Sequence, residues 1–473
     1  MFRKFIKDSI IYTIPSLLSR STSFFLIPLY TRILNPSTFG SFDLFLIFTN
    51  LINLTISLEI TQAVARFYVD EESKNKKRLI LSTSFWFTIF CYLFFLLITF
   101  YFSIPLSKYI MGDIKFNKTF QFGLIYIFFT GIYYFIQNQL RWDLKSIEYS
   151  ILSAINAILT IFFTFILCNF LHFGLDGIIF SMILSSIISL VYGLYILKND
   201  IKFIFSNNLL KNLLKFSIPL VFSSLSVYIS NYIGRILITK YSSLTELGVY
   251  AIAFRISSII GLVMTGIQTS LSPLIYSHHK EKDTPEVIAK IFRYFVFTSL
   301  LVSSILIIYS NLIVNIFSTK DYFDAEKLLI FLIPSILFSQ MYIFAPGIGI
   351  AKKTIYYIWI NLVGAILSII LNYILIINFG IQGASIANLL VYFILFIIYM
   401  ILSQSLYYVP HEWNKIFLLF TLSFIVLFFF KYFLINLNLL FGVLIPFLLF
   451  IIVYKIKFFK KEDLSFLKFK IKY

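Results

Sequence analysis

Polar residues divide this chain into long apolar runs, and each run predicts a membrane-spanning helix. A helix needs about 20 apolar residues to cross a bilayer, and most of the runs reach that length. The pattern therefore predicts an all-α integral membrane protein with about 14 transmembrane helices. The predicted spans are 9–34, 40–66, 79–103, 118–140, 148–170, 174–197, 213–239, 246–276, 288–317, 326–350, 354–377, 381–404, 413–434 and 438–456.

The composition indicates that lipid, not water, surrounds most of the outer surface. Hydrophobic residues make up 60% of the 473 positions and charged residues only 13%, whereas soluble domains carry about 25% charged residues. The net charge of +18 could indicate a nucleic-acid partner, but the lysines and arginines fall in short connectors between apolar runs. This distribution is typical of membrane loops, so we expect no nucleic-acid partner.

The cysteines and histidines predict neither a disulfide framework nor a metal site. Cys91 and Cys168 both lie inside predicted spans, and two cysteines so placed match no zinc-binding spacing. His278 and His279 are adjacent in a charged connector and have no third ligand at a useful spacing.

The distribution of Lys and Arg between connectors predicts the orientation in the membrane. If the N-terminus is inside, the inner segments hold 27 of these residues and the outer connectors hold about eight. Cytoplasmic loops are enriched in Lys and Arg. The sequence therefore predicts a multi-pass protein of the cell inner (plasma) membrane with both termini in the cytoplasm.

Three short patterns recur along the chain at an offset near 206 residues and predict an internal repeat. The matching pairs are 9–15 with 215–219, 31–40 with 239–248, and 173–177 with 379–383. Six spans per repeat return the chain to the same side, so the two halves should have the same topology, as in transporters built from parallel repeats. This predicts an N-lobe (1–204), a C-lobe (205–405) and a region (406–473) with two further helices and a basic cytoplasmic tail. A cleft between the lobes would permit alternating access.

Three arginines inside predicted spans are the candidate substrate-binding residues: Arg20, Arg255 and Arg235. An arginine at a helix centre costs about 2.5–3.5 kcal/mol on insertion scales, so it should face a wet cavity or a partner. Each of the three continues a hydroxyl-rich helix face. Because the guanidinium fork suits phosphate, we predict a cationic cavity for an anionic substrate. The alternative is that these arginines extend to the interface or pair with buried carboxylates, and it stays open for Arg235 above all.

Acidic residues in the first hairpin have two interpretations. Glu59 is either a proton-coupling carboxylate or the structural counter-ion of Arg20, which lies at a similar depth on the preceding span. Asp43 and Arg32 are expected to pair near the outer surface in a structural role. A polar face on span 354–377 predicts packing between helices rather than binding.

Catalytic and nucleotide-binding motifs are absent from the sequence. No Gly-x-x-x-x-Gly-Lys-Ser/Thr phosphate loop, Gly-x-Ser-x-Gly or His-Glu-x-x-His element occurs, so we expect no ATP hydrolysis by this chain and no cofactor. The connectors are too short to build a loop-borne active site. The chain is therefore predicted to be a transporter and not an enzyme.

Two segments resemble a known family. Residues 24–44 (FFLIPLYTRILNPSTFGSFDL) are similar to the first hairpin of bacterial polysaccharide-biosynthesis transporters, and 63–68 (AVARFY) resembles the end of that hairpin. The predicted helix count, the repeat and the basic intramembrane residues extend the resemblance over the whole chain. The architecture is shared with the superfamily of multidrug, oligosaccharidyl-lipid and polysaccharide exporters, which includes lipid II flippases.

The resemblance implies a flippase for undecaprenyl-diphosphate-linked oligosaccharide repeat units of O-antigen (lipopolysaccharide) or capsule. In that family, basic cavity residues are thought to engage the diphosphate and acidic sugars. This implication extends to Arg20 and Arg255, and more weakly to Arg235, by their position in the predicted cavity. The lipid bilayer, a polymerase and other assembly proteins are the implied partners.

Other functions remain open on the sequence. A drug or toxin extruder of the same superfamily is the first alternative, although a cation exporter would favour an intramembrane carboxylate where this chain has Arg20. A lipid II flippase differs only in its substrate. A membrane polysaccharide polymerase or ligase is disfavoured by the short connectors, and a structural scaffold leaves the buried arginines unexplained.

Overall fold

The computed structural model describes most of the chain as helices. The described residues are 22, 24–261, 271, 275, 278–353, 355–433, 444–456, 458 and 459, and none of these is in a strand. Ten helices among them are long and apolar enough to cross a membrane, and the longest of these is two helices joined at a kink, which correspond to two predicted spans. Most of the predicted span 9–34 and the end of 246–276 lie outside the described residues. The chain is an all-helical, multi-pass membrane protein.

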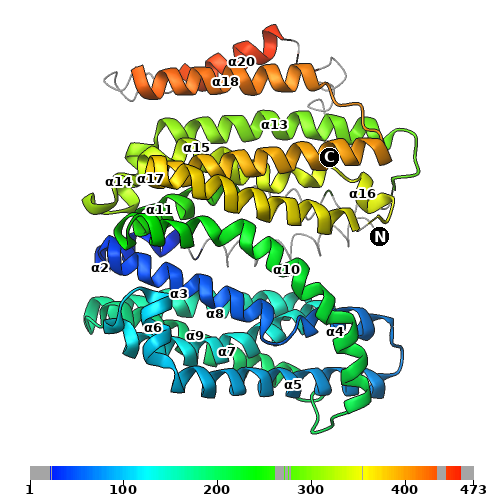
Figure 1. Ribbon diagram of the computed structural model, residues 1–473. Coiled ribbons are helices and arrows are strands. Elements are labelled where there is room, and N and C mark those ends of the chain that lie inside the picture. The colour runs from blue at the N-terminus through cyan, green and yellow to red at the C-terminus, as the bar shows by residue number, and fades with distance from the viewer. Residues whose placement is uncertain are drawn as a thin grey trace, which may run out of the picture. The chain divides into compact units, whose positions relative to one another are not determined.

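The helices fall into two compact units (Figure 1). Unit 1 consists of Met1–Arg255 with Asn361–Ala384, and unit 2 of Ile256–Ile360 with Ser385–Tyr473. The predicted lobe boundaries at 204/205 and 405/406 stay a prediction. The helices of unit 1 are α2 (Ile27–Ile33), α3 (Pro36–Thr55), α4 (Ile60–Asp70), α5 (Lys74–Tyr101), α6 (Ser103–Met111), α7 (Asn117–Trp142), α8 (Ser146–Phe165), α9 (Gly174–Leu197), α10 (Asn207–Tyr241) and most of α11 (Leu244–Ser257), with short turns η1 (Ile114–Phe116) and η2 (Ile166–Phe170).

Unit 2 contains the remaining helices, and one element, which is two helices joined at a kink at Gly380, contributes to both units. Helix α17 (Ile355–Leu406) passes from unit 1 to unit 2 after Ala384. The other helices of unit 2 are α13 (Thr284–Ile308), α14 (Ser310–Phe317), η3 (Lys320–Tyr322), α15 (Ala325–Gln340), η4 (Met341–Phe344), α16 (Gly347–Ile350), α18 (Trp413–Phe433) and α20 (Leu444–Lys455).

Backbone geometry, rather than polarity, interrupts one predicted span. The predicted span 40–66 is two helices, since Leu58 and Glu59 both have positive φ values, 52° and 54°. A non-glycine residue in this region is strained and cannot continue a right-handed helix. In α17 the backbone leaves the helical conformation at Gly380 (φ 57°), so two helices meet at a kink between the predicted spans 354–377 and 381–404.

In unit 1, helices α3 and α11 approach each other very closely. A Cβ added to Gly40 on α3 would clash with the backbone of Leu244, and one added to Gly248 on α11 would clash with the backbone of Pro36. Only glycine permits this approach. Gly40 and Gly248 are equivalent positions of the predicted repeat, and their contact fixes the register of α3 against α11.

Helix α10 is bent in Figure 1 and has Pro219 inside it. Proline removes one helical hydrogen bond and kinks a helix.

The predicted span 354–377 corresponds to the first part of α17, and its polar face packs against α10. Ser368 donates a hydrogen bond to the Ser230 carbonyl of α10 at 3.3 Å. Asn372 is fully buried and lies against Gly234. This face packs between helices, as the sequence predicted.

Candidate functional site

Asp43 lies at the centre of a buried cluster of charges in unit 1. Arg235 Nη1 donates to both carboxylate oxygens of Asp43, at 3.2 and 2.9 Å, and Arg255 Nη2 lies 3.8 Å from Asp43 Oδ1. The Asp43 side chain is 2% exposed, and the two arginine side chains are 10% and 13% exposed. Together these three side chains carry one net positive charge.

The three charged residues come from three helices. The close contact of α3 and α11 at Gly40 and Gly248 brings Asp43 and Arg255 together. Asp43 follows Gly40 by one helical turn on α3, and Arg255 follows Gly248 by two turns on α11. The close approach of these helices therefore brings the two side chains within reach of each other. Helix α10 supplies Arg235 from a third direction.

Aromatic rings surround both guanidinium groups. The Arg255 group lies 4.8 Å from the ring centre of Phe39 and 5.6 Å from that of Tyr30, with Phe42 slightly farther away. The Arg235 group lies 4.3 Å from the Phe254 ring. Cation–π contacts are worth about 2 kcal/mol when desolvated. The rings thus hold both arginines in fixed orientations and partly replace the water lost on burial.

A polar pocket of about 260 Å³ in unit 1 includes Arg255 in its lining. Hydroxyl and amide groups supply the rest of its polar surface, and none of the described residues lining it is acidic. Such a lining can donate hydrogen bonds to an anionic or hydroxyl-rich ligand. Its polar members are Thr22, Tyr30, Tyr126, Asn156, Thr160, Ser185, Ser186 and Arg255.

Glu59 lies at the break between α3 and α4. Its side chain is buried, and Oε1 accepts a hydrogen bond of 2.5 Å from the Ser224 hydroxyl of α10. No lysine or arginine in the described ranges forms an ion pair with it. The structure thus gives Glu59 a hydroxyl partner. Arg20, which the sequence offered as its counter-ion, lies outside the described residues.

The structure corrects the predicted partner of Asp43 and adds this residue to the candidate site. The expected Asp43–Arg32 pair is wrong, because Asp43 binds Arg235 and Arg255 instead. The error arose because helix spacing alone gives no information about which helices cross. The cost of burying an arginine indicated that Arg235 and Arg255 need a partner or a wet cavity, but no sequence pattern pointed to Asp43.

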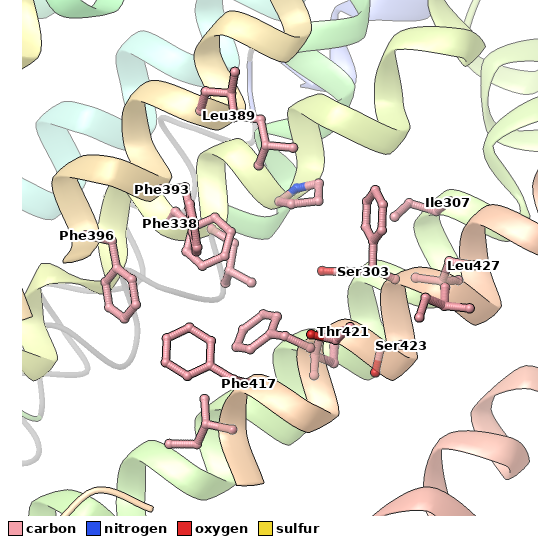
Figure 2. A pocket seen from close by; sticks show the side chains of 18 of the residues that line it. Ser303, Ile307, Phe338, Leu389, Phe393, Phe396, Phe417, Thr421, Ser423 and Leu427 are labelled. Carbon is pink, nitrogen blue, oxygen red and sulfur yellow. The ribbon is translucent and has the colours of Figure 1, made fainter. Parts of the chain in front are cut away.

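Unit 2 contains a second pocket of different chemistry (Figure 2). Its volume is about 350 Å³ and its walls are almost entirely apolar, with aromatic rings such as Phe338, Phe393 and Phe417. These side chains come from α15, α17 and α18. The Ser303 hydroxyl of α13 is buried there and has no hydrogen-bond partner within the described residues. This pocket suits an apolar ligand, and none of the described residues that line it is charged.

Comparison with protein families places the chain by sequence. A family model described as polysaccharide biosynthesis protein matches residues 29–284, which is more than half of the chain. A second model, MatE, matches residues 219–374. The membrane protein MJ1375 of Methanocaldococcus jannaschii is 26% identical over 418 residues, covering 83% of this chain and 96% of that protein. A protein of the Lsg locus of Haemophilus influenzae is 22% identical over 307 residues, covering 63% of this chain and 72% of the relative.

Two solved transporter structures have the same fold. The lipid II flippase MurJ in an inward closed conformation matches with a TM-score of 0.73 at 18% identity, covering 96% of this chain and 100% of MurJ. An inward-facing multidrug resistance MATE family transporter of the MOP superfamily matches with a TM-score of 0.69 at 16% identity, covering 84% and 97%. At these identities the likeness shows the fold. The chain belongs to the polysaccharide biosynthesis protein family and has the transporter fold of the MOP superfamily.

Proposed function

We propose that this protein is a flippase that moves undecaprenyl-diphosphate-linked oligosaccharide repeat units from the cytoplasmic to the outer leaflet. The observation that carries the proposal is the position of Arg255. This arginine contacts Asp43 and also lines a pocket of hydroxyl and amide groups without acidic residues among those described. A diphosphate needs cationic donors, and sugars need many hydrogen-bonding groups. The name of the structural neighbour MurJ, a lipid II flippase, supports the same class of substrate.

Under this proposal the protein moves the polar head group and leaves the lipid tail in the bilayer. The diphosphate and the sugars cannot cross hydrocarbon unaided, whereas a polyprenyl chain is soluble there. With the cell interior negative, outward movement of each negative charge is favoured by about 2.3 kcal/mol per 100 mV. The two proposed lobes, 1–204 and 205–405, would alternate access to the two sides, and the protein acts without ATP and without chemistry on its substrate.

The cation cluster has a definite role in this scheme. Asp43 is the resting counter-ion of Arg235 and Arg255, and the substrate diphosphate competes with it for the guanidinium groups. Arg235 makes the closer contact with Asp43, so Arg255 is the arginine that the substrate engages first. Arg20 is proposed to contribute a third cation. Both termini are proposed to lie on the cytoplasmic side of the inner membrane.

Glu59 is proposed as the coupling carboxylate. It is buried at a helix break and its described partner is a hydroxyl, not a cation. In transporters, interrupted helices near the membrane midplane are common sites for coupling ions. A proton on Glu59 would remove its charge and change the hydrogen bond to Ser224, which joins α10 to the break.

Deletion of the gene in its host tests the proposed substrate directly. Lipid-linked oligosaccharides are extracted and the surface polysaccharide is assayed in parallel. Single repeat units should accumulate on the cytoplasmic face while the surface polymer is lost. An intact surface polymer with new sensitivity to cationic drugs would contradict the proposal and favour a drug extruder of the same fold.

A further inference from the structure

The connector between α9 and α10, residues 198–206, is tied to α5 by three hydrogen bonds. Trp86 Nε1 donates to the Lys202 carbonyl at 2.9 Å. In return, the Lys202 N–H donates to Ser82 Oγ at 2.9 Å, and the Ser206 N–H donates to Thr83 Oγ1 at 3.3 Å. Three bonds from consecutive turns of one helix fix the backbone of this connector.

Two ion pairs hold the same connector from other directions. Asp200 Oδ1 lies 3.8 Å from Arg78 Nε at the start of α5, and Asp200 Oδ2 lies 3.6 Å from Lys145 Nζ in the connector before α8. All these partners belong to unit 1. The connector is therefore a fixed surface of this unit.

This fixed surface exposes three consecutive large apolar side chains. Phe203 is 93% exposed, Phe205 is 49% exposed and Ile204 is 40% exposed. The Phe203 ring stacks on Trp86 with 4.9 Å between ring centres. Large apolar groups that are held rigidly outward indicate an interaction surface. Because hydrogen bonds fix the backbone, these side chains cannot easily turn inward to bury themselves.

The position of the connector identifies what covers it. Helix α5 begins at Lys74, α9 ends at Leu197 and α10 begins at Asn207, and all three are candidate membrane spans. The connector therefore lies where these spans leave the membrane. At that level, exposed apolar side chains meet the boundary between lipid chains and head groups.

The charge of the connector matches anionic lipid. Lys198 and Lys202 are both exposed, while the one acidic residue of the connector, Asp200, is occupied by Arg78 and Lys145. We propose that residues 198–206 form a docking surface for anionic phospholipid head groups. The apolar side chains of 203–205 enter the lipid boundary, and the two lysines contact the head-group phosphates. The surface anchors the start of α10, and its action does not depend on which substrate the protein moves.

The depth of Phe203 in the membrane tests the apolar half of the proposal. A nitroxide is attached at Phe203→Cys in full-length protein carrying Cys91→Ala and Cys168→Ala, reconstituted in phosphatidylglycerol–phosphatidylcholine nanodiscs. A matched label at Glu72→Cys reports an exposed charged position in the connector before α5. Oxygen should raise the relaxation rate of the nitroxide at 203 more strongly than a water-soluble nickel complex does. At position 72 the nickel complex should have the stronger effect. Equal access of the nickel complex to both labels would overturn the proposal and favour a soluble protein partner.

Lipid retention tests the charged half. The protein is released from mixed nanodiscs in a mass spectrometer, and retained phosphatidylglycerol is compared with retained phosphatidylcholine. Each lysine near an anionic surface is worth about fivefold in binding, so Lys198→Gln with Lys202→Gln should lower the preference by about thirtyfold. The control pair, Lys108→Gln with Lys115→Gln in the segment between α5 and α7, should leave most of it intact. An unchanged preference in the connector variant would overturn the proposal, and neither assay depends on transport activity.

Discussion

The Arg255 pocket of unit 1 and the phenylalanine-lined pocket of unit 2 have opposite chemistry although both are built from apolar membrane helices. The unit 1 pocket is lined by hydroxyls, an amide and Arg255, which an ion pair and aromatic rings hold in place. The unit 2 pocket is larger, is walled by phenylalanines and has no charged lining among the described residues. The two units therefore differ in the ligands that these pockets suit. Polar ligand chemistry is concentrated in unit 1, while unit 2 offers a surface for apolar groups.

The largest expected effect is the loss of transport when the unit 1 arginine is removed. Arg255→Ala should abolish complementation of the deletion strain while leaving membrane insertion intact, and Arg20→Ala should do the same. Arg255→Lys keeps the charge but loses the two-pronged donor geometry, so it should restore only part of the activity. Immunoblots of membrane fractions and surface-polysaccharide assays provide the measurement.

Arg66→Ala is the control for that experiment. The Arg66 side chain is 64% exposed and pairs with Asp70 on its own helix, so this variant should behave as wild type. Wild-type activity of both Arg20→Ala and Arg255→Ala would instead contradict the cationic site and remove the functional distinction between the two units.

The second effect concerns stability. Asp43→Asn leaves two buried guanidinium groups without their carboxylate and should destabilise the protein by about 3–5 kcal/mol. Thermal unfolding of purified protein in detergent measures the change. Asp113→Asn is the matched control, because Asp113 forms an exposed pair with Lys115 and surface pairs contribute about 0–1 kcal/mol. Equal unfolding temperatures for the two variants would contradict the role given to Asp43.

A third test addresses unit 2, where a buried histidine introduces pH dependence. His411 lies between α17 and α18 against Phe292 and Trp413. Burial, and then the charge of Arg293, lower the pKa of His411 to about 4. Its usual value is about 6.5, so the unfolded chain takes up a proton at a higher pH than the folded protein does.

The stability that this group contributes is therefore present above about pH 6.5 and is lost as the pH falls toward 4. The full loss corresponds to about 3 kcal/mol. His411→Phe should flatten the fall in unfolding temperature between pH 7.5 and pH 5, relative to wild type. Identical pH profiles for the two proteins would show that His411 does not titrate in this way.

The smallest effects compare single hydroxyls in the two pockets. In unit 1, Thr160 Oγ1 donates to Ser185 Oγ at 2.8 Å, so Thr160→Val should cost about 1 kcal/mol. In unit 2, Ser303 has a buried hydroxyl without a partner in the described part of the chain, so Ser303→Ala should be neutral or stabilising. Unfolding in detergent measures both variants. A destabilised Ser303→Ala would mean that this hydroxyl has a partner and that the unit 2 pocket is more polar than its lining indicates.

Sequence reasoning found the arginines of the cluster but not their shared partner. Helix periodicity places Arg235 and Arg255 on polar faces of their own spans, and the cost of burying charge marks both as residues that need a partner. Neither argument states which helices touch. The pairing with Asp43 depends on the crossing of α3 and α11 at Gly40 and Gly248, two glycines that the repeat had singled out without predicting their contact.

What the sequence by itself determined is the membrane class, the helical architecture and the family, because apolar run length, charge placement and local motifs are properties of consecutive residues. Only the tertiary structure decided where helices break and which side chains meet. The interruption at Leu58 and Glu59 depends on backbone dihedral angles that hydrophobicity does not encode. The cluster of Asp43, Arg235 and Arg255 joins residues up to 212 positions apart along the chain, and only the packing of three helices brings them within reach.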